Sequence, residues 1–222
     1  MSIALLTPEQ AAATQQVLRE ESARREHLVV HLSGAHAYGF PSPDSDVDLK
    51  AIHITPSAAL LGFKPPPLAA DRAEWVLGVE MDYTSNELCQ VLSGILRGNG
   101  NFLERVLGST ALQSLPLLDE LRPLVQASLS RRLHGHYSGF ARGQHREFRA
   151  KATAKRALYV LRTALTGLHA LRCARIVPDL TQLLDEYGYA DARALVAIKQ
   201  SGERAPLPEP QQAEWDARLS QA

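Results

Sequence analysis

The sequence predicts an α+β protein in which strands and helices alternate at first and helices alone follow. Three observations support this class. Apolar runs of strand length and alternating runs occur before residue 110. Beyond that point, apolar residues recur at helical spacing. The composition also shifts near residue 110, so we place one domain over residues 1–110 and an all-helical domain over residues 111–222.

The start of the expected first helix is marked by its sequence. Thr7 can cap it, Pro8 suits its first turn and Gln10 completes a capping box, so the helix should extend to about Arg25. Alternating and helical periods define the elements that follow. In order, they are a strand over 28–32, a strand over 46–54, a short helix over 56–63, a strand over 75–83, a helix from Ser85 that ends before Asn99, and a short helix over 102–107.

The expected second domain consists of helices joined by loops. A row of leucines at helical spacing predicts a long helix over 152–174. Further helices are expected over 178–187 and 190–199. A proline-rich linker over 206–210 then precedes a short exposed helix at the C-terminus.

Composition favours a folded protein and excludes few partners. Hydrophobic residues make up 45% of the chain and charged residues 22%, which suits a packed core. Lys+Arg and Asp+Glu are both 24, so net charge identifies no partner, although a basic window over 131–162 is suited to phosphates. No apolar run approaches the roughly 20 residues needed to cross a bilayer, and no signal peptide is visible, so we expect a cytoplasmic protein. Cys89 and Cys173 have neither disulfide nor metal-type spacing and are expected to be buried thiols.

Two aspartates in the second expected strand mark a candidate metal site. Asp46 and Asp48 are two residues apart, so on a strand their carboxylates share one face. Like charges this close repel and call for protons or a cation. Val47 and Leu49 look buried, and carboxylates interleaved with them are costly unless a cation offsets their charge. Hard oxygen ligands at this spacing suit Mg²⁺, which commonly also binds substrate phosphates.

A third carboxylate is available in the next expected strand. Glu80 and Asp82 are again two residues apart and on one face. Asp82 is the favoured ligand because it lies where the strand opens into a helix, and Glu80 is the alternative. Two metal ions held by three carboxylates would bind a triphosphate and activate an attacking hydroxyl for in-line displacement at phosphorus.

These residues belong to a set of motifs that resembles a known family. In chain order the set comprises Gly34-Ala35-His36-Ala37-Tyr38-Gly39, Pro43-Asp44-Ser45-Asp46-Val47-Asp48, Glu80-Met81-Asp82, Gly98-Asn99-Gly100-Asn101-Phe102-Leu103-Glu104 and Lys155-Arg156-Ala157-Leu158-Tyr159-Val160-Leu161-Arg162. It resembles the DNA polymerase beta superfamily of nucleotidyltransferases, and most closely the RNA-repair-pathway DNA polymerase beta-like branch. The resemblance covers roughly residues 28 to 190.

The resemblance implies both a fold and a reaction. The fold would be a small mixed sheet with flanking helices, followed by a helical domain that closes over the nucleotide. The reaction would be Mg²⁺-dependent (or Mn²⁺-dependent) transfer of a nucleoside monophosphate from an NTP, such as ATP, to a hydroxyl group. Asp46 and Asp48 would hold both metal ions, and Asp82 would help to activate the acceptor.

Residues that would contact the nucleotide come from two regions. The first is the glycine turn, with Ser33, Gly34, Ala35, His36 and Tyr38, where backbone N–H groups can approach the triphosphate. His36 and Tyr38 would contact the nucleotide there or simply pack the turn. The family has Ser where this chain has Ala35, and loss of that hydroxyl removes about 1.5–3 kcal/mol of hydrogen bonding to a charged group.

The second region is the long helix. Lys155 and Arg162 are two helical turns apart, so they share a face and could meet the triphosphate. The alternative is that they form a solvated stripe beside a leucine core.

The acceptor is expected to be an RNA end, by association with the RNA-repair branch and because the basic window could follow a phosphate backbone. A small-molecule or protein hydroxyl is the alternative acceptor. A regulatory nucleotide-binding module that has lost catalysis is a further alternative, which Ala35 favours and the three carboxylates oppose. We expect no membrane partner, and the sequence does not determine the oligomeric state.

Overall fold

The computed structural model describes residues 2–202 and 206–222 and confirms the α+β class. The chain divides into two compact units. Unit 1 comprises the residues up to His36 together with Asp46–Ser128, and unit 2 comprises Ala37–Ser45 together with the residues from Leu129 onward. The division falls after Ser128 instead of near residue 110, because the strand β5 (Ala111–Ser114) pairs with β1 (Glu26–Leu32).

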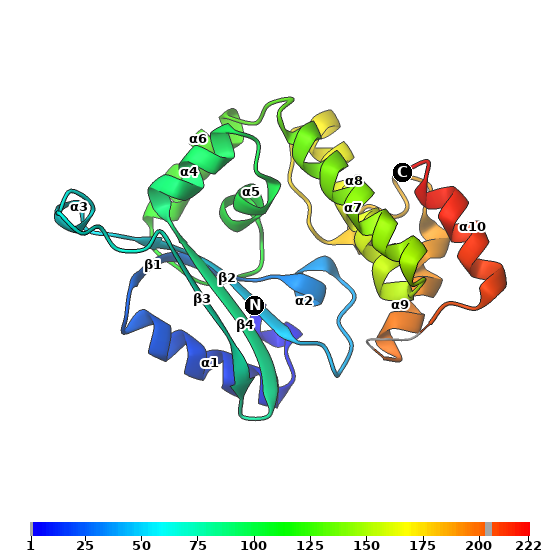
Figure 1. Cartoon of the computed structure of the whole chain (residues 1–222), viewed down its shortest axis with the longest axis horizontal. Helices are drawn as coiled ribbons and strands as arrows, with labels where there is room; N and C mark the ends of the chain where they lie inside the picture. The colour runs from blue at the N-terminus through cyan, green and yellow to red at the C-terminus, as the bar shows by residue number, and fades with distance from the viewer. Residues whose placement is uncertain (1, 203–205) are drawn as a thin grey trace. The chain divides into compact units, whose positions relative to one another are not determined.

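Unit 1 is built on a five-stranded mixed sheet with the strand order β3-β4-β2-β1-β5. The remaining strands are β2 (Val47–Ile54), β3 (Ala69–Val76) and β4 (Val79–Glu87). β2 and β4 run parallel, whereas the pairs β1–β2, β1–β5 and β3–β4 are antiparallel. The helix α1 (Pro8–Ser22) lies on one face of the sheet, and α4 (Leu88–Leu96) and α5 (Gly100–Leu107) lie on the other (Figure 1).

Burial alternates along the first half of β2, over residues 47–50, as the sequence predicted. Val47, Leu49 and Ala51 are fully buried in a core cluster with Ala13 and Val17 of α1. Because successive side chains on a strand point to opposite faces, the side chains between these residues belong to the face away from α1. In its first half the strand therefore has Val47 and Leu49 on one face and Asp48 and Lys50 on the other, while the fully buried Ile52 follows on the face of the charged residues.

The single strand expected over 75–83 is wrong, because the structure has a hairpin there. β3 and β4 are joined at Leu77 and Gly78, whose φ angles are +50° and +79°. Positive φ at both central residues is what a two-residue type I′ turn requires. Side chains alternate between the two faces of the sheet before and after the turn, so the two-residue period does not show where the turn lies.

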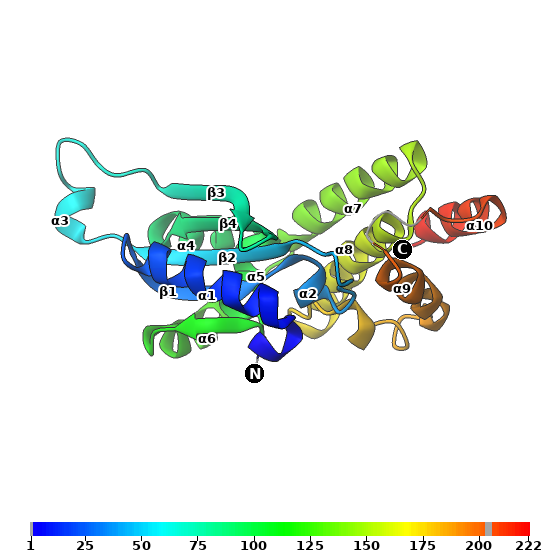
Figure 2. The same ribbon diagram turned by 90° about the horizontal axis from the view of Figure 1, so that it is seen from below.

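Short elements complete unit 1. They are the 3₁₀ helix η1 (Ser2–Leu5), α3 (Ser57–Leu60), α6 (Leu117–Ala127) and α2 (Gly34–Tyr38), which continues into unit 2. α3 follows β2 in the chain and lies beyond the end of the sheet at which β2 ends (Figure 2). β5 corrects the expectation that everything beyond residue 110 is helical; it is a four-residue edge strand, too short for its period to stand out.

Unit 2 is helical from Leu129 onward. α7 (Leu133–Ala150) and α8 (Ala154–Cys173) are joined by a short loop and pack side by side, as both views show (Figures 1 and 2). The remaining regular elements are the 3₁₀ helices η2 (Leu180–Gln182) and η3 (Ala190–Ala192), α9 (Arg193–Gln200) and α10 (Glu209–Leu219).

Three expectations for unit 2 need correction. The helix expected over 178–187 is only η2 followed by turns, because the Asp179 carboxylate accepts from the Thr181 backbone and hydroxyl and closes a tight 3₁₀ cap. α10 is not simply exposed, since Trp215 and Leu219 are buried. Cys173 lies at the exposed end of α8, and Cys89 in unit 1 is also exposed, so neither thiol is buried.

No helix in residues 2–202 or 206–222 combines the length and the apolar character that a bilayer crossing requires.

Two buried histidines on β1 predict that acid destabilises the protein. Burial lowers the pKa of His27 and of His31 from 6.5 to about 4, and the nearby charges of Arg25 and Arg122, respectively, act in the same direction. Between these pH values the unfolded chain binds more protons than the folded one, so the free energy of unfolding falls as pH falls from 6.5 towards 4. We expect a loss of about 3 kcal/mol per imidazole.

Urea unfolding across this pH range measures the effect. The double variant His27→Gln, His31→Gln should show a shallower dependence on pH than the parent. A free energy of unfolding that stays constant in the parent from pH 6.5 to pH 4 would contradict the buried, neutral state of both rings.

Candidate active site

Two of the three candidate carboxylates lie opposite each other in the sheet. The parallel register of β2 and β4 pairs Asp48 with Asp82. Asp46 comes directly before β2, is partly exposed and lies two residues from Asp48. Glu80 is exposed and pairs with Trp75 of β3. The register therefore puts Asp82, and not Glu80, directly across from Asp48.

Lys50 lies between these carboxylates, and the sequence analysis missed it. Its Nζ is 3.2 Å from Asp82 Oδ2 and 3.8 Å from Asp48 Oδ1. It also donates to the Thr84 hydroxyl at 3.3 Å. Lys50 is two residues beyond Asp48, so the period that paired Asp46 with Asp48 also places Lys50 on their face. Its ammonium supplies the positive charge that the paired carboxylates need.

The glycine turn packs directly against Asp48. Gly34 has a φ of +56°, and a Cβ at this position would overlap with Asp48 Oδ2. The backbone N–H of Ser33 donates to the Asp48 carbonyl oxygen at 2.9 Å. Ala35, at the position where the family has serine, is buried. Only glycine combines this backbone conformation with so close an approach to a carboxylate.

His36 packs the turn, which was one of its two expected roles. The ring is buried, and Nε2 lies 3.3 Å from Oε1 of Gln10. The same Gln10 oxygen accepts from the Thr7 backbone in the capping box at the start of α1. His36 therefore connects the turn to the first helix of unit 1.

The other three candidate nucleotide contacts lie together in unit 2. The Arg162 guanidinium carbon is 3.7 Å from the centre of the Tyr38 ring. Tyr38 contacts Tyr159 edge to face at 5.8 Å, and Lys155 Nζ is 5.7 Å from the centre of the Tyr159 ring. Arg162 is buried, so the solvated stripe is wrong for that residue. A role for Tyr38, Lys155 and Arg162 in holding a triphosphate stays a prediction.

A comparison of the chain with models of known protein families identifies the family to which it belongs. Residues 10–221 match the model of the RNA repair pathway DNA polymerase beta family. The chain belongs to that family. Over 159 residues it is 28% identical to the uncharacterized protein MJ0002 of Methanocaldococcus jannaschii, a match that covers 69% of this chain and 64% of that protein. The chain thus spans less than two thirds of the length of that relative.

A solved structure also resembles the chain at low similarity. It is a nucleotidyltransferase-like protein from Exiguobacterium sibiricum, with 14% sequence identity and a TM-score of 0.40. The alignment covers 95% of this chain and 74% of that one.

In this member of the RNA repair pathway DNA polymerase beta family, the site's donor set suits a divalent cation. Asp46, Asp48 and Asp82 offer the hard oxygen ligands that Mg²⁺ prefers. Within the described residues, however, one carboxylate oxygen from each of these three aspartates does not lie within 4.8 Å of the other two. The Lys50 ammonium lies at Asp48 and Asp82 instead, so a bound cation must share the carboxylates with it.

Lys50→Gln should therefore raise the affinity of the metal-free protein for Mg²⁺. The ammonium repels a cation that binds the same carboxylates, and unit charges about 4 Å apart interact by about 4 kcal/mol at an effective dielectric constant of about 20. We expect at least a roughly ten-fold gain, measured by calorimetric titration with Mg²⁺. Lys64→Gln, at an exposed lysine in the loop after α3, is the control and should bind like the parent. Equal affinity in all three proteins would contradict the competition.

Proposed function

We propose that this protein is a Mg²⁺-dependent nucleotidyltransferase that moves a nucleoside monophosphate from an NTP to a hydroxyl group at an RNA end, with pyrophosphate as the leaving group. The observation that carries the proposal is the position of Asp48, which faces Asp82 across two parallel strands and contacts the backbone of Gly34. A carboxylate pair beside a glycine turn is suited to a metal-bridged triphosphate. Membership of the family supports the same reaction class.

Each acidic residue has a separate role in this proposal. Asp46 and Asp48 would hold the metal ions, and Asp82 would accept the proton of the attacking hydroxyl. Lys50 neutralises Asp48 and Asp82 when no cation is bound. The metal ions, Mg²⁺ or Mn²⁺, would supply charge neutralisation on the phosphates and lower the pKa of the attacking hydroxyl.

The proposed RNA acceptor is supported by the family and by the charge on unit 2. Arginines and lysines are exposed along and around α7, and they could follow a phosphate backbone. The exposed members are Arg131, Arg132, Arg142, Arg146, Arg149 and Lys151. A pocket of about 410 Å³ is lined in part by Lys151, Lys155, Arg156 and Tyr159, which combine positive charge with an aromatic ring. Such a surface favours a nucleic acid over a neutral small molecule.

A labelled-nucleotide screen tests the proposal. The protein is incubated with Mg²⁺ and each α-labelled NTP, in separate reactions with a short RNA, a small-molecule polyol and a protein acceptor. Label transferred to RNA supports the proposal, and label on either other acceptor moves the reaction to that substrate. Calorimetric NTP binding without any transfer would instead indicate a regulatory module, the alternative that Ala35 favours.

A further inference from the structure

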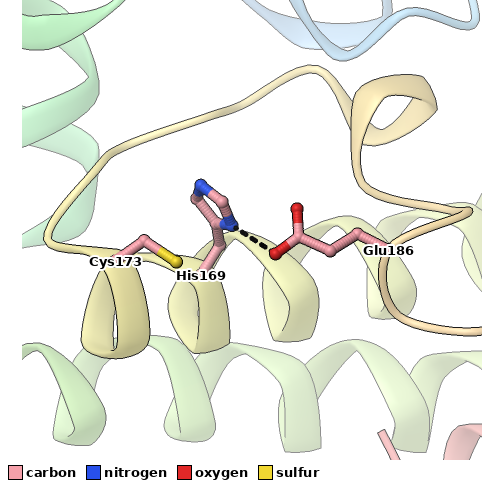
Figure 3. Close-up of side chains that lie close together, drawn as sticks. All are labelled: His169, Cys173 and Glu186. Carbon is pink, nitrogen blue, oxygen red and sulfur yellow. Dashed lines mark ion pairs between the residues drawn. The ribbon is translucent and has the colours of Figure 1, made fainter.

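Three metal-binding side chains of different chemistry meet at the C-terminal end of α8. His169 and Cys173 are four residues apart on this helix, so they lie on the same face one turn from each other. Glu186, in the turns that follow η2, points toward His169 (Figure 3). One ligand atom from each of the three lies within 4.8 Å of the others. All three residues belong to unit 2.

The separation of the ring and the carboxylate suits an ion between them. His169 Nδ1 and Glu186 Oε1 are 3.5 Å apart, the contact drawn as a dashed line in Figure 3. A charge-assisted N–H···O bond is shorter, about 2.7–2.9 Å. With Zn²⁺ bonds of about 2.0–2.2 Å to nitrogen and oxygen, two ligands of a tetrahedral ion lie roughly 3.3–3.6 Å apart.

The donor types select the class of metal. A thiolate and an imidazole are ligands of Zn²⁺ and of similar transition metals, whereas Mg²⁺ takes oxygen ligands. Cys173 is exposed and the Glu186 side chain is 49% exposed, so an ion from solvent can reach both. The His169 side chain is 10% exposed, and the Tyr187 hydroxyl lies 3.0 Å from its Nδ1. An ion that coordinates this nitrogen displaces the Tyr187 hydroxyl from it, because a coordinated imidazole nitrogen has neither a lone pair nor a proton left for that hydrogen bond.

We propose that His169, Cys173 and Glu186 form a binding site for Zn²⁺ or a chemically similar divalent transition metal, with water at the fourth position. On binding, the Cys173 thiol loses its proton to the solvent and the resulting thiolate coordinates the ion. The bound ion connects α8 to the turns that follow η2. This is a stabilising site, and it does not depend on the proposed transferase reaction.

The segment between α8 and α9, which the bound ion would connect to α8, has little regular structure of its own. Between α8 and α9, the structure contains only the short 3₁₀ helices η2 and η3 among loops and turns. A ligand that binds the folded state alone stabilises it in proportion to the logarithm of its concentration over its dissociation constant. Zn²⁺ should therefore raise the melting temperature of the full chain.

Cobalt titration of the metal-free full-length protein provides a direct test. Co²⁺ bound to a thiolate produces a charge-transfer absorption that Zn²⁺ then abolishes by displacement. We expect this band to saturate at one ion per chain, and Cys173→Ser to lose it. His169→Gln and Glu186→Gln should weaken binding by at least roughly ten-fold. Cys89→Ser is the matched control, because Cys89 is the other exposed cysteine, and it should behave like the parent.

Thiol alkylation gives a second readout that does not depend on the folding of variants. Zn²⁺ should protect Cys173 of the unmodified protein from iodoacetamide and leave Cys89 reactive, as mass spectrometry of the digested protein will show. Asp48→Asn should give the same thiolate charge-transfer band as the parent, because that band reports only the ion at Cys173, which separates this site from the carboxylates of unit 1. Equal labelling of both cysteines in the presence of Zn²⁺, or a charge-transfer band that persists in Cys173→Ser, would overturn the proposal.

Discussion

Replacing Asp48 or Asp82 with asparagine is expected to abolish nucleotidyl transfer and leave the protein folded. Each substitution keeps the shape of the side chain. It removes the negative charge with which the carboxylate coordinates a divalent cation or accepts a proton. The charge stabilisation lost at such a site is several kcal/mol, which corresponds to a rate loss on the order of 10³-fold. Asp46→Asn should have an effect of the same size. Transfer of labelled nucleotide to RNA measures the rate, and circular dichroism confirms the fold.

Glu80→Gln is the variant that makes this test specific. Glu80 lies on the same strand and carries the same charge, but the register places Asp82, not Glu80, opposite Asp48. We expect Glu80→Gln to retain activity. If Glu80→Gln were inactive and Asp82→Asn active, the third carboxylate would be Glu80. If Asp48→Asn were as active as the parent, the proposed site would be in the wrong place.

Gly34→Ala is expected to cause the second large loss of activity. A Cβ at this position overlaps with Asp48 Oδ2, so the carboxylate must move or the turn must open. Misplacing a catalytic group by about 1 Å can reduce the rate about 100-fold. The positive φ of Gly34 adds roughly 1–2 kcal/mol of backbone strain for alanine. Both effects act together in this variant, so the measurement needs a control that separates them.

Gly78→Ala supplies that control. Gly78 has a φ of +79° in the β3–β4 turn, and a Cβ there would meet nothing within 4 Å. Its substitution should lower the free energy of unfolding by a similar 1–2 kcal/mol, measured by urea denaturation, with activity retained. Equal activity in Gly34→Ala and Gly78→Ala would show that contact between Gly34 and Asp48 does not matter for the reaction.

Local chemistry explains why many elements could be predicted. The capping box at Thr7 and Gln10 marks the start of α1, and both of its hydrogen bonds are present. The two-residue period over the first half of β2 correctly separated the buried Val47 and Leu49 from Asp48. These features depend on neighbours within a few positions, so the sequence contains all the information that they need.

The incorrect predictions involve features that lack such local signals. The β3–β4 hairpin was missed because its turn contains Leu77, a residue that rarely adopts positive φ. The exposure of Cys89 and Cys173 depends on what packs over the ends of α4 and α8, which helical spacing does not reveal.

The sequence by itself determined the helices and strands with a clear period, the two-residue spacing of Asp46 and Asp48, and the glycine turn before them. Only the tertiary structure decided that Asp82 faces Asp48, that Lys50 lies between them, and that Glu186 meets His169. The physical reason is that periodicity follows from the backbone geometry of one segment, whereas these pairs join segments distant in the chain. Their partners are set by strand register and by the path of the connecting loops, which depend on the packing of the rest of the unit.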